Sequence, residues 1–132
     1  MTKRPGLSAI AILAFVAVAP QAHALCVAPK KLTNIYKSND GGTYFVRRVG
    51  STVWWMGRSG DDGRSWINVF HGTLSGNTFM GAWSDVAGNS GSGTLTLRIL
   101  GSIETGVHGF ERIGGTGSGF GGQRWGIPCN DT

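Results

Sequence analysis

The placement of glycine constrains this chain more than any other feature. The 132 residues include 23 glycines, more than twice the average usage of about 7%. The glycines separate short runs in which apolar and polar residues alternate, and the region after residue 24 lacks the 3.6-residue spacing of an amphipathic helix. Helix interiors tolerate glycine poorly, whereas turns, bulges and tight barrel corners use it. The sequence therefore predicts an all-β fold.

The alternating runs predict seven or eight strands, at residues 32–37, 43–49, 52–57, 65–70, 78–84, 94–100, 103–110 and 123–127. The segments between them have turn composition, such as Asn39-Asp40-Gly41-Gly42 and Gly50-Ser51. Short consecutive strands in one domain suggest an antiparallel meander, as a small barrel or a sandwich. We predict a single small antiparallel β-barrel. Residues 113–126, rich in glycine, are interpreted as a long flexible loop before the last strand, or alternatively as an ordered binding loop.

The first 24 residues have the pattern of a secretory signal peptide. Lys3 and Arg4 precede an apolar run over residues 9–19, and Ala22-His23-Ala24 is a small-x-small cleavage site. A membrane anchor would need about 20 apolar residues, and Pro20 interrupts the run before that length. We therefore expect a barrel domain over residues 25–132 that is secreted or periplasmic.

The two cysteines, Cys26 and Cys129, lie near opposite ends of that domain. In an exported protein this placement favours one disulfide between them. The chain-entropy model assigns a loop of about 100 residues roughly 4 to 5 kcal/mol of stabilisation.

Charge excludes one class of partner. Lys3 and Arg4 would leave with the signal peptide, so the formal net charge of +5 falls to +3. The remaining basic residues are scattered and form no stripe, so we expect no nucleic-acid partner. We also expect no membrane partner.

The segment Ser59-Gly60-Asp61-Asp62-Gly63-Arg64-Ser65-Trp66 fits the pattern S-x-D-x-G-x-[ST]-W and resembles the Asp-box of sialidases. Sialidase propellers need several blades of about 40 to 50 residues each, and the box occurs once here. The resemblance implies a structural hairpin, not a catalytic one. In it Ser59 would open the turn, Asp61 would bond backbone amides, Gly63 would be left-handed, and Trp66 would pack against the hairpin.

Residues 32–46 resemble the opening hairpin of the avidin family, through L-T-x-x-aromatic, a polar turn, and G-x-T-aromatic-x-V. Residues 71–83 resemble the glycine and tryptophan rhythm of calycins, the group that joins avidins and lipocalins. The resemblance implies an eight-stranded barrel, open at one end, that holds a small ligand. It implies that Tyr44, Val46 and Trp55 point inward and that Trp54 points outward. Residues 42–83 also resemble small secreted bacterial proteins of no settled function.

The biotin chemistry of avidins is not carried over. The turn positions that bond the ligand in biotin binders align with Ser38 and Gly42, and the tryptophans that enclose biotin have no counterparts in order. The candidate ligand-binding residues are Ser38, Tyr44, Val46, Arg48, Trp55, Asn68, Trp83 and Trp125. Among the tryptophans, Trp54 and Trp125 are expected to be the most exposed.

Catalytic and metal-binding patterns are weak. The sequence contains neither a G-x-S-x-G elbow nor an H-E-x-x-H helix, and no spacing pairs His71 or His108 with a carboxylate. Two distant histidines do not make a metal site, so we expect no metal and no cofactor.

These features favour an exported, non-enzymatic binding protein. Its partner would be a small apolar molecule, a sugar or another protein, and the barrel would be compatible with a homo-oligomer. Two alternatives stay open: a secreted inhibitor of a protease or similar enzyme, and a small hydrolase that uses His71 or His108.

Overall fold

The computed structural model describes residues 2, 27–117 and 119–128. The signal peptide and the pairing of Cys26 with Cys129 lie outside the described residues and stay predictions. The described part contains no α-helix, and therefore none that could cross a membrane. Its eight strands are β1 (Asn34–Ser38), β2 (Thr43–Val49), β3 (Thr52–Arg58), β4 (Ile67–Ser75), β5 (Thr78–Ala87), β6 (Ser92–Ser102), β7 (Gly106–Thr116) and β8 (Arg124–Gly126).

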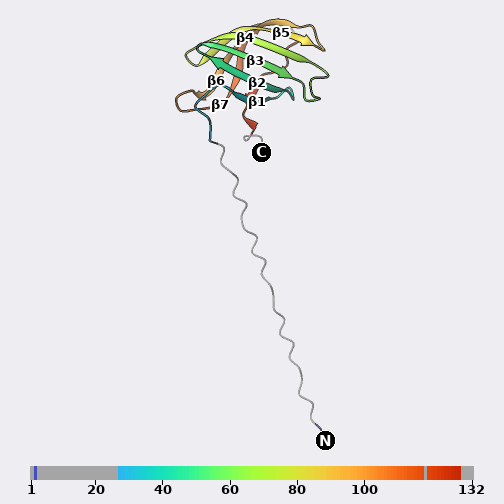
Figure 1. The fold of residues 1–132 in the computed structure, drawn as a ribbon, viewed down its shortest axis with the longest axis vertical. Coiled ribbons are helices and arrows are strands. Elements are labelled where there is room, and N and C mark those ends of the chain that lie inside the picture. The colour runs from blue at the N-terminus through green and yellow to red at the C-terminus, as the bar shows by residue number, and fades with distance from the viewer. Residues whose placement is uncertain (1, 3–26, 118, 129–132) are drawn as a thin grey trace.

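The strands form a closed antiparallel meander (Figure 1). Each strand pairs with the next, and β8 pairs with both β7 and β1. Closure leaves the sheet without a free edge. The predicted all-β barrel is thereby confirmed.

The first long hairpin has the predicted register. Val49 faces Thr52, and Arg47 faces Trp54 across β2 and β3. Trp55 is 3% exposed, whereas Trp54 is 49% exposed. The inward and outward assignments of these two tryptophans are confirmed, because a two-residue turn at Gly50-Ser51 fixes which side chains share a face.

Aromatic side chains fill most of the barrel interior. The rings of Trp55 and Phe70 stack with centroids 4.3 Å apart, and those of Phe110 and Trp125 stack at 4.9 Å. Such pairs stabilise beyond their buried area by about 0.5 to 1.5 kcal/mol each. The buried aromatic residues are Tyr36, Tyr44, Trp55, Phe70, Phe79, Trp83, Phe110 and Trp125.

The interpretation of residues 113–126 as a loop is wrong for its first part. Strand β7 continues to Thr116, and Gly115 pairs with Leu95 of β6. A Cβ atom at Gly115 would lie 2.2 Å from the carbonyl oxygen of Thr94. Glycine here allows two backbones to approach closely and does not mark a loop.

The expected exposure of Trp125 is also wrong, because this residue is 0% exposed. Strand β8 lies between β7 and β1, and pairs Trp125 with Phe110 on one side and Ser38 on the other. The indole ring therefore completes the core where the barrel closes.

The meander places four connections at one end of the barrel, which we call the mouth. They join β1 to β2, β3 to β4, β5 to β6 and β7 to β8. All of the aspartates among the described residues lie at this end: Asp40, Asp61, Asp62 and Asp85. Cations lie at the same end, among them Arg58, Arg64 and Arg124, so both signs of charge occur around the mouth.

Candidate functional site

A cavity of about 130 Å³ opens at the mouth. Liquid water occupies about 30 Å³ per molecule, so the cavity has room for a small polar group and not for a large ligand. We call it the mouth cavity. It is lined by Asp40, Trp66, Asn68, Asp85, Asn89, Gly119, Phe120 and Gly121.

Hydrogen bonds hold two of the lining residues in place. The Tyr44 hydroxyl donates to Asp40 Oδ2 at 2.5 Å, and the Gly42 amide donates to Asp40 Oδ1 at 2.8 Å. The Trp55 indole Nε1 donates to Asn68 Oδ1 at 2.9 Å. Burial raises the pKa of Tyr44, and the nearby Asp40 charge raises it further. The phenol is therefore neutral at physiological pH and remains a donor to Asp40.

Phe120 covers the aromatic interior at this end. Its ring centroid lies 4.8 Å from that of Trp83, 6.0 Å from Trp125 and 6.2 Å from Trp55. Arg112 Nη1 donates to the Phe120 carbonyl oxygen at 3.3 Å, and its guanidinium lies 6.0 Å from the Phe120 ring centroid. Phe120 thus occupies a cage of three tryptophans and one arginine.

Two of the caging tryptophans have unused hydrogen-bond donors. Nε1 of Trp83 and Nε1 of Trp125 are buried and have no partner among the described residues. An unsatisfied buried donor costs about 1 to 3 kcal/mol, and such groups are uncommon in native structures. The cage therefore contains two donors that an acceptor group could satisfy.

The lining of the mouth cavity is negatively charged. It contains the carboxylates of Asp40 and Asp85 and no lysine or arginine. Asp85 Oδ2 accepts from the Gly91 amide at 2.9 Å, which fixes the carboxylate toward the turn between β5 and β6. The mouth cavity is thus suited to a group that donates hydrogen bonds or is positively charged.

The turn that resembles an Asp-box positions Trp66 over the mouth cavity. The Ser65 amide donates to Asp61 Oδ1 at 3.1 Å, the Ser65 hydroxyl donates to Asp61 Oδ2 at 2.5 Å, and the Ser59 hydroxyl also bonds Asp61. These hydrogen bonds lower the pKa of Asp61. Gly63 has a φ of +81°, and the Trp66 ring lies 5.9 Å from the Tyr44 ring.

The structure brings most of the candidate ligand-binding residues together inside the barrel. Asn68 contacts Trp55, and Tyr44 contacts both Trp55 and Trp125. The residues of this interior set are Tyr44, Val46, Trp55, Asn68, Trp83 and Trp125.

Two candidates lie elsewhere. Arg48 was expected on the inner face because it alternates with Tyr44 and Val46, but it is exposed at the end opposite the mouth, where its Nε donates to the Gly50 carbonyl at 2.7 Å. Apolar and polar residues still alternate in the sequence beyond Val46, where β2 leaves the packed interior. The alternation therefore does not identify a ligand contact at Arg48. Ser38 ends β1 and lines a groove on the outside of the barrel.

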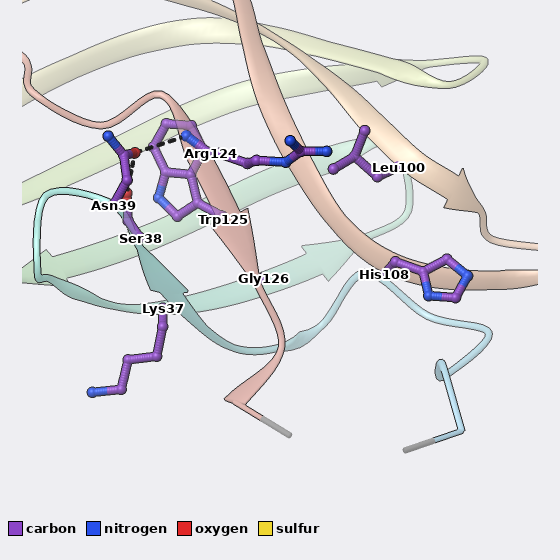
Figure 2. A pocket seen from close by; sticks show the side chains of 8 residues that line it. All are labelled: Lys37, Ser38, Asn39, Leu100, His108, Arg124, Trp125 and Gly126. Carbon is purple, nitrogen blue, oxygen red and sulfur yellow. Dashed lines mark hydrogen bonds between the residues drawn. The ribbon is translucent and has the colours of Figure 1, made fainter. Parts of the chain in front are cut away.

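That groove has a volume of about 600 Å³ and follows β8 (Figure 2). Its cations do not converge: Figure 2 shows the side chains of Lys37 and Arg124 pointing in different directions, with His108 on a separate strand. The Arg124 amide donates to Asn39 Oδ1 at 2.9 Å and so stabilises the turn between β1 and β2. The groove is larger than the mouth cavity but has no converging polar groups, and we do not assign the site to it.

The histidines of the hydrolase hypothesis also lie on the outside. His71 lies in the middle of β4, with its ring centroid 4.2 Å from that of Trp54, and His108 lines the groove along β8. Neither lines the mouth cavity. Among the described residues, no three His, Cys, Asp or Glu side chains group as metal ligands would.

Sequence reasoning missed several residues of the mouth cavity. Asp40 appeared only as part of a polar turn, Asp85 and Asn89 flank a turn between strands, and Phe120 lies within the glycine-rich segment. The cavity is formed by four connections far apart in the chain, and no local spacing shows that they meet.

Known proteins provide no further guidance. No family model matches this chain, and neither a curated protein nor a solved structure does.

Proposed function

We propose that this chain is an exported, non-enzymatic binding protein that holds a small molecule at the mouth of the barrel. One observation supports this above all: hydrogen bonds from Tyr44 and Trp55 hold Asp40 and Asn68 in a cavity that the rings of Trp66 and Phe120 also line. Small-molecule sites are typically concave and largely apolar, with a few fixed polar groups.

The chemistry of the mouth cavity favours a small organic cation. Asp40 and Asp85 supply negative charge, and Trp66 supplies an aromatic ring that attracts a cation. A ligand that also contains a flat apolar part would take the place of Phe120 in the tryptophan cage. An acceptor atom on that part could then bond the free indole N–H of Trp83 or Trp125.

Calorimetric titration with three matched probes tests the proposal: benzylamine, benzyl alcohol and benzoate have the same ring and differ in charge. We expect benzylamine to bind most tightly and benzoate not to bind. Asp85→Asn should weaken benzylamine binding about fivefold to tenfold, the loss of about 1 kcal/mol or more. Asp62→Asn removes an exposed charge from the same end without altering the lining and should have no such effect.

Equal binding of the three probes, or loss of binding in Asp62→Asn alone, would contradict the assignment. The inhibitor and hydrolase hypotheses stay predictions. The inhibitor hypothesis predicts a stable complex with a protease. The hydrolase hypothesis predicts turnover of a substrate that depends on His71 or His108.

A further inference from the structure

The outer surface of β1 to β4 contains an unbroken row of large apolar side chains. Ile35 pairs with Phe45, Phe45 with Met56, and Met56 with Val69, so the row crosses four strands without a gap. Each of these side chains is between 36 and 44% exposed. We call the outward side chains of these four strands the β1–β4 wall, and Figure 1 labels the strands themselves.

A second row lies beside the first. Arg47 pairs with Trp54, and Trp54 pairs with His71. The Trp54 and His71 rings lie 4.2 Å apart, and the indole is 49% exposed. Trp54 is therefore the aromatic residue that the barrel presents most openly to a partner.

The charge of the wall has one sign. Its outward strand positions include Lys37, Arg47 and Arg58 and no aspartate or glutamate. Arg58 lies over the Phe45 ring, 5.7 Å from its centroid, next to the apolar row. Its one carboxylate neighbour, Asp62, is a loop residue 3.9 Å away and largely exposed. An exposed apolar patch with a polar rim marks an interaction surface.

We infer that the β1–β4 wall adsorbs to an anionic lipid surface. Its aromatic and aliphatic side chains would enter the headgroup region, and Lys37, Arg47 and Arg58 would contact lipid phosphates. Each basic residue near such a surface contributes about 1 kcal/mol, so the binding would be reversible. This departs from the expectation, drawn from the sequence alone, that the protein has no membrane partner.

Area and charge favour lipid over the other occupants. Neighbouring strands lie about 4.8 Å apart, so two rows over four strands cover only a few hundred Å². A stable protein interface needs about 800 Å² on each partner. A second copy would also bring two sets of wall cations together without wall carboxylates. A deformable lipid surface can follow the convex wall and reach the cations on both sides of the apolar row.

Flotation of the mature protein with vesicles tests the inference. One set of vesicles contains phosphatidylcholine with phosphatidylglycerol, and the other contains phosphatidylcholine alone. We expect binding to the anionic vesicles at low salt, a blue shift in tryptophan emission, and release at high salt. Trp54→Thr should reduce partitioning about tenfold and Arg47→Gln about fivefold. Ile113→Thr, an equally exposed position on β7, should have no effect.

Circular dichroism and melting of each variant establish that the fold is intact. Failure to float with anionic vesicles would overturn the inference, as would equal flotation with neutral ones. If sedimentation shows that the protein is a dimer and that Trp54→Thr makes it a monomer, the wall would instead bind a second copy of this chain. Binding to soluble polyglutamate without flotation would assign it to an acidic protein.

Discussion

At the scale of single residues, Asn68 connects the fold to the proposed site. It is 3% exposed and is one of two buried polar or charged residues in the described part of the chain. Its Oδ1 accepts the Trp55 indole proton inside the barrel, and its side chain also lines the mouth cavity. A change at this residue should therefore alter both stability and binding.

Replacing Asn68 with leucine should lower the free energy of unfolding by about 1 to 3 kcal/mol, because the Trp55 N–H would lose its partner. Trp55→Phe removes the same hydrogen bond from the other side. Denaturant unfolding of both single variants and the double variant forms a cycle. We expect a coupling energy of about 1 kcal/mol, and strictly additive effects would contradict a direct Trp55–Asn68 interaction.

Asp61 should make stability depend on pH in the acid range. Its hydrogen bonds hold its folded pKa below the ordinary value, so it contributes stability above its unfolded pKa of about 3.9 and loses it as the pH falls through the folded value. Asp61→Asn should lower the melting temperature at neutral pH, and this deficit should shrink below about pH 4. A deficit that stays constant down to pH 2 would show that Asp61 acts without its charge.

At the scale of elements, turn chemistry made the β2–β3 hairpin predictable. Gly50-Ser51 fixes the register, and the register fixes which of Trp54 and Trp55 is buried. The end of β7 was not predictable, since Gly114 and Gly115 read locally as a loop. Both lie in a strand, and at Gly115 β6 approaches β7 closely, which depends on tertiary structure. Of the residues that line the mouth cavity, Asn68 on β4 was the one predicted as a ligand contact, whereas Asp85 on β5 and the turn residues were missed.

The pairing of β4 with β5 depends on a cross-strand pair of glycines. Gly72 faces Gly81, and a Cβ atom on Gly81 would lie 2.0 Å from the His71 carbonyl oxygen and 2.4 Å from the Gly72 Cα. Gly81→Ala should therefore cost about 2 kcal/mol or more, or prevent folding, because backbone atoms must shift. Gly126→Ala meets no atom within 4 Å and should be nearly neutral. Thermal melting of both variants measures the contrast, and equal loss would contradict the close approach.

At the scale of the whole molecule, Pro29 and Gly126, which lie near the limits of the described barrel domain, both contact β7. The Val107 amide donates to the Pro29 carbonyl at 2.8 Å, and Gly126 pairs with Gly109, so residues near both cysteines reach the start of β7. The disulfide between Cys26 and Cys129 stays a prediction from the sequence. Unreduced protein should lack reactive thiols, and reduction should lower the free energy of unfolding by up to about 4 kcal/mol. Two titratable thiols in the unreduced, denatured protein would contradict the pairing.

The lining of the mouth cavity and the β1–β4 wall differ in the sign of their charge. The described aspartates all lie at the mouth, whereas the wall strands contain only cations among their charged outward side chains. A small cation at the mouth and an anionic surface at the wall would bind opposite signs of charge. The two contacts could therefore be made at the same time.

The central claim is that the mouth of the barrel binds a small molecule, and the indole N–H signals of the five tryptophans in a ¹⁵N-labelled sample test it most directly. On titration with benzylamine, the signals of Trp83 and Trp125 should move together and saturate, because their environments lie beneath the mouth cavity. The signal of Trp54, on the outer wall, should stay in place. Movement of Trp54 alone, or no saturable movement with any probe, would contradict the account.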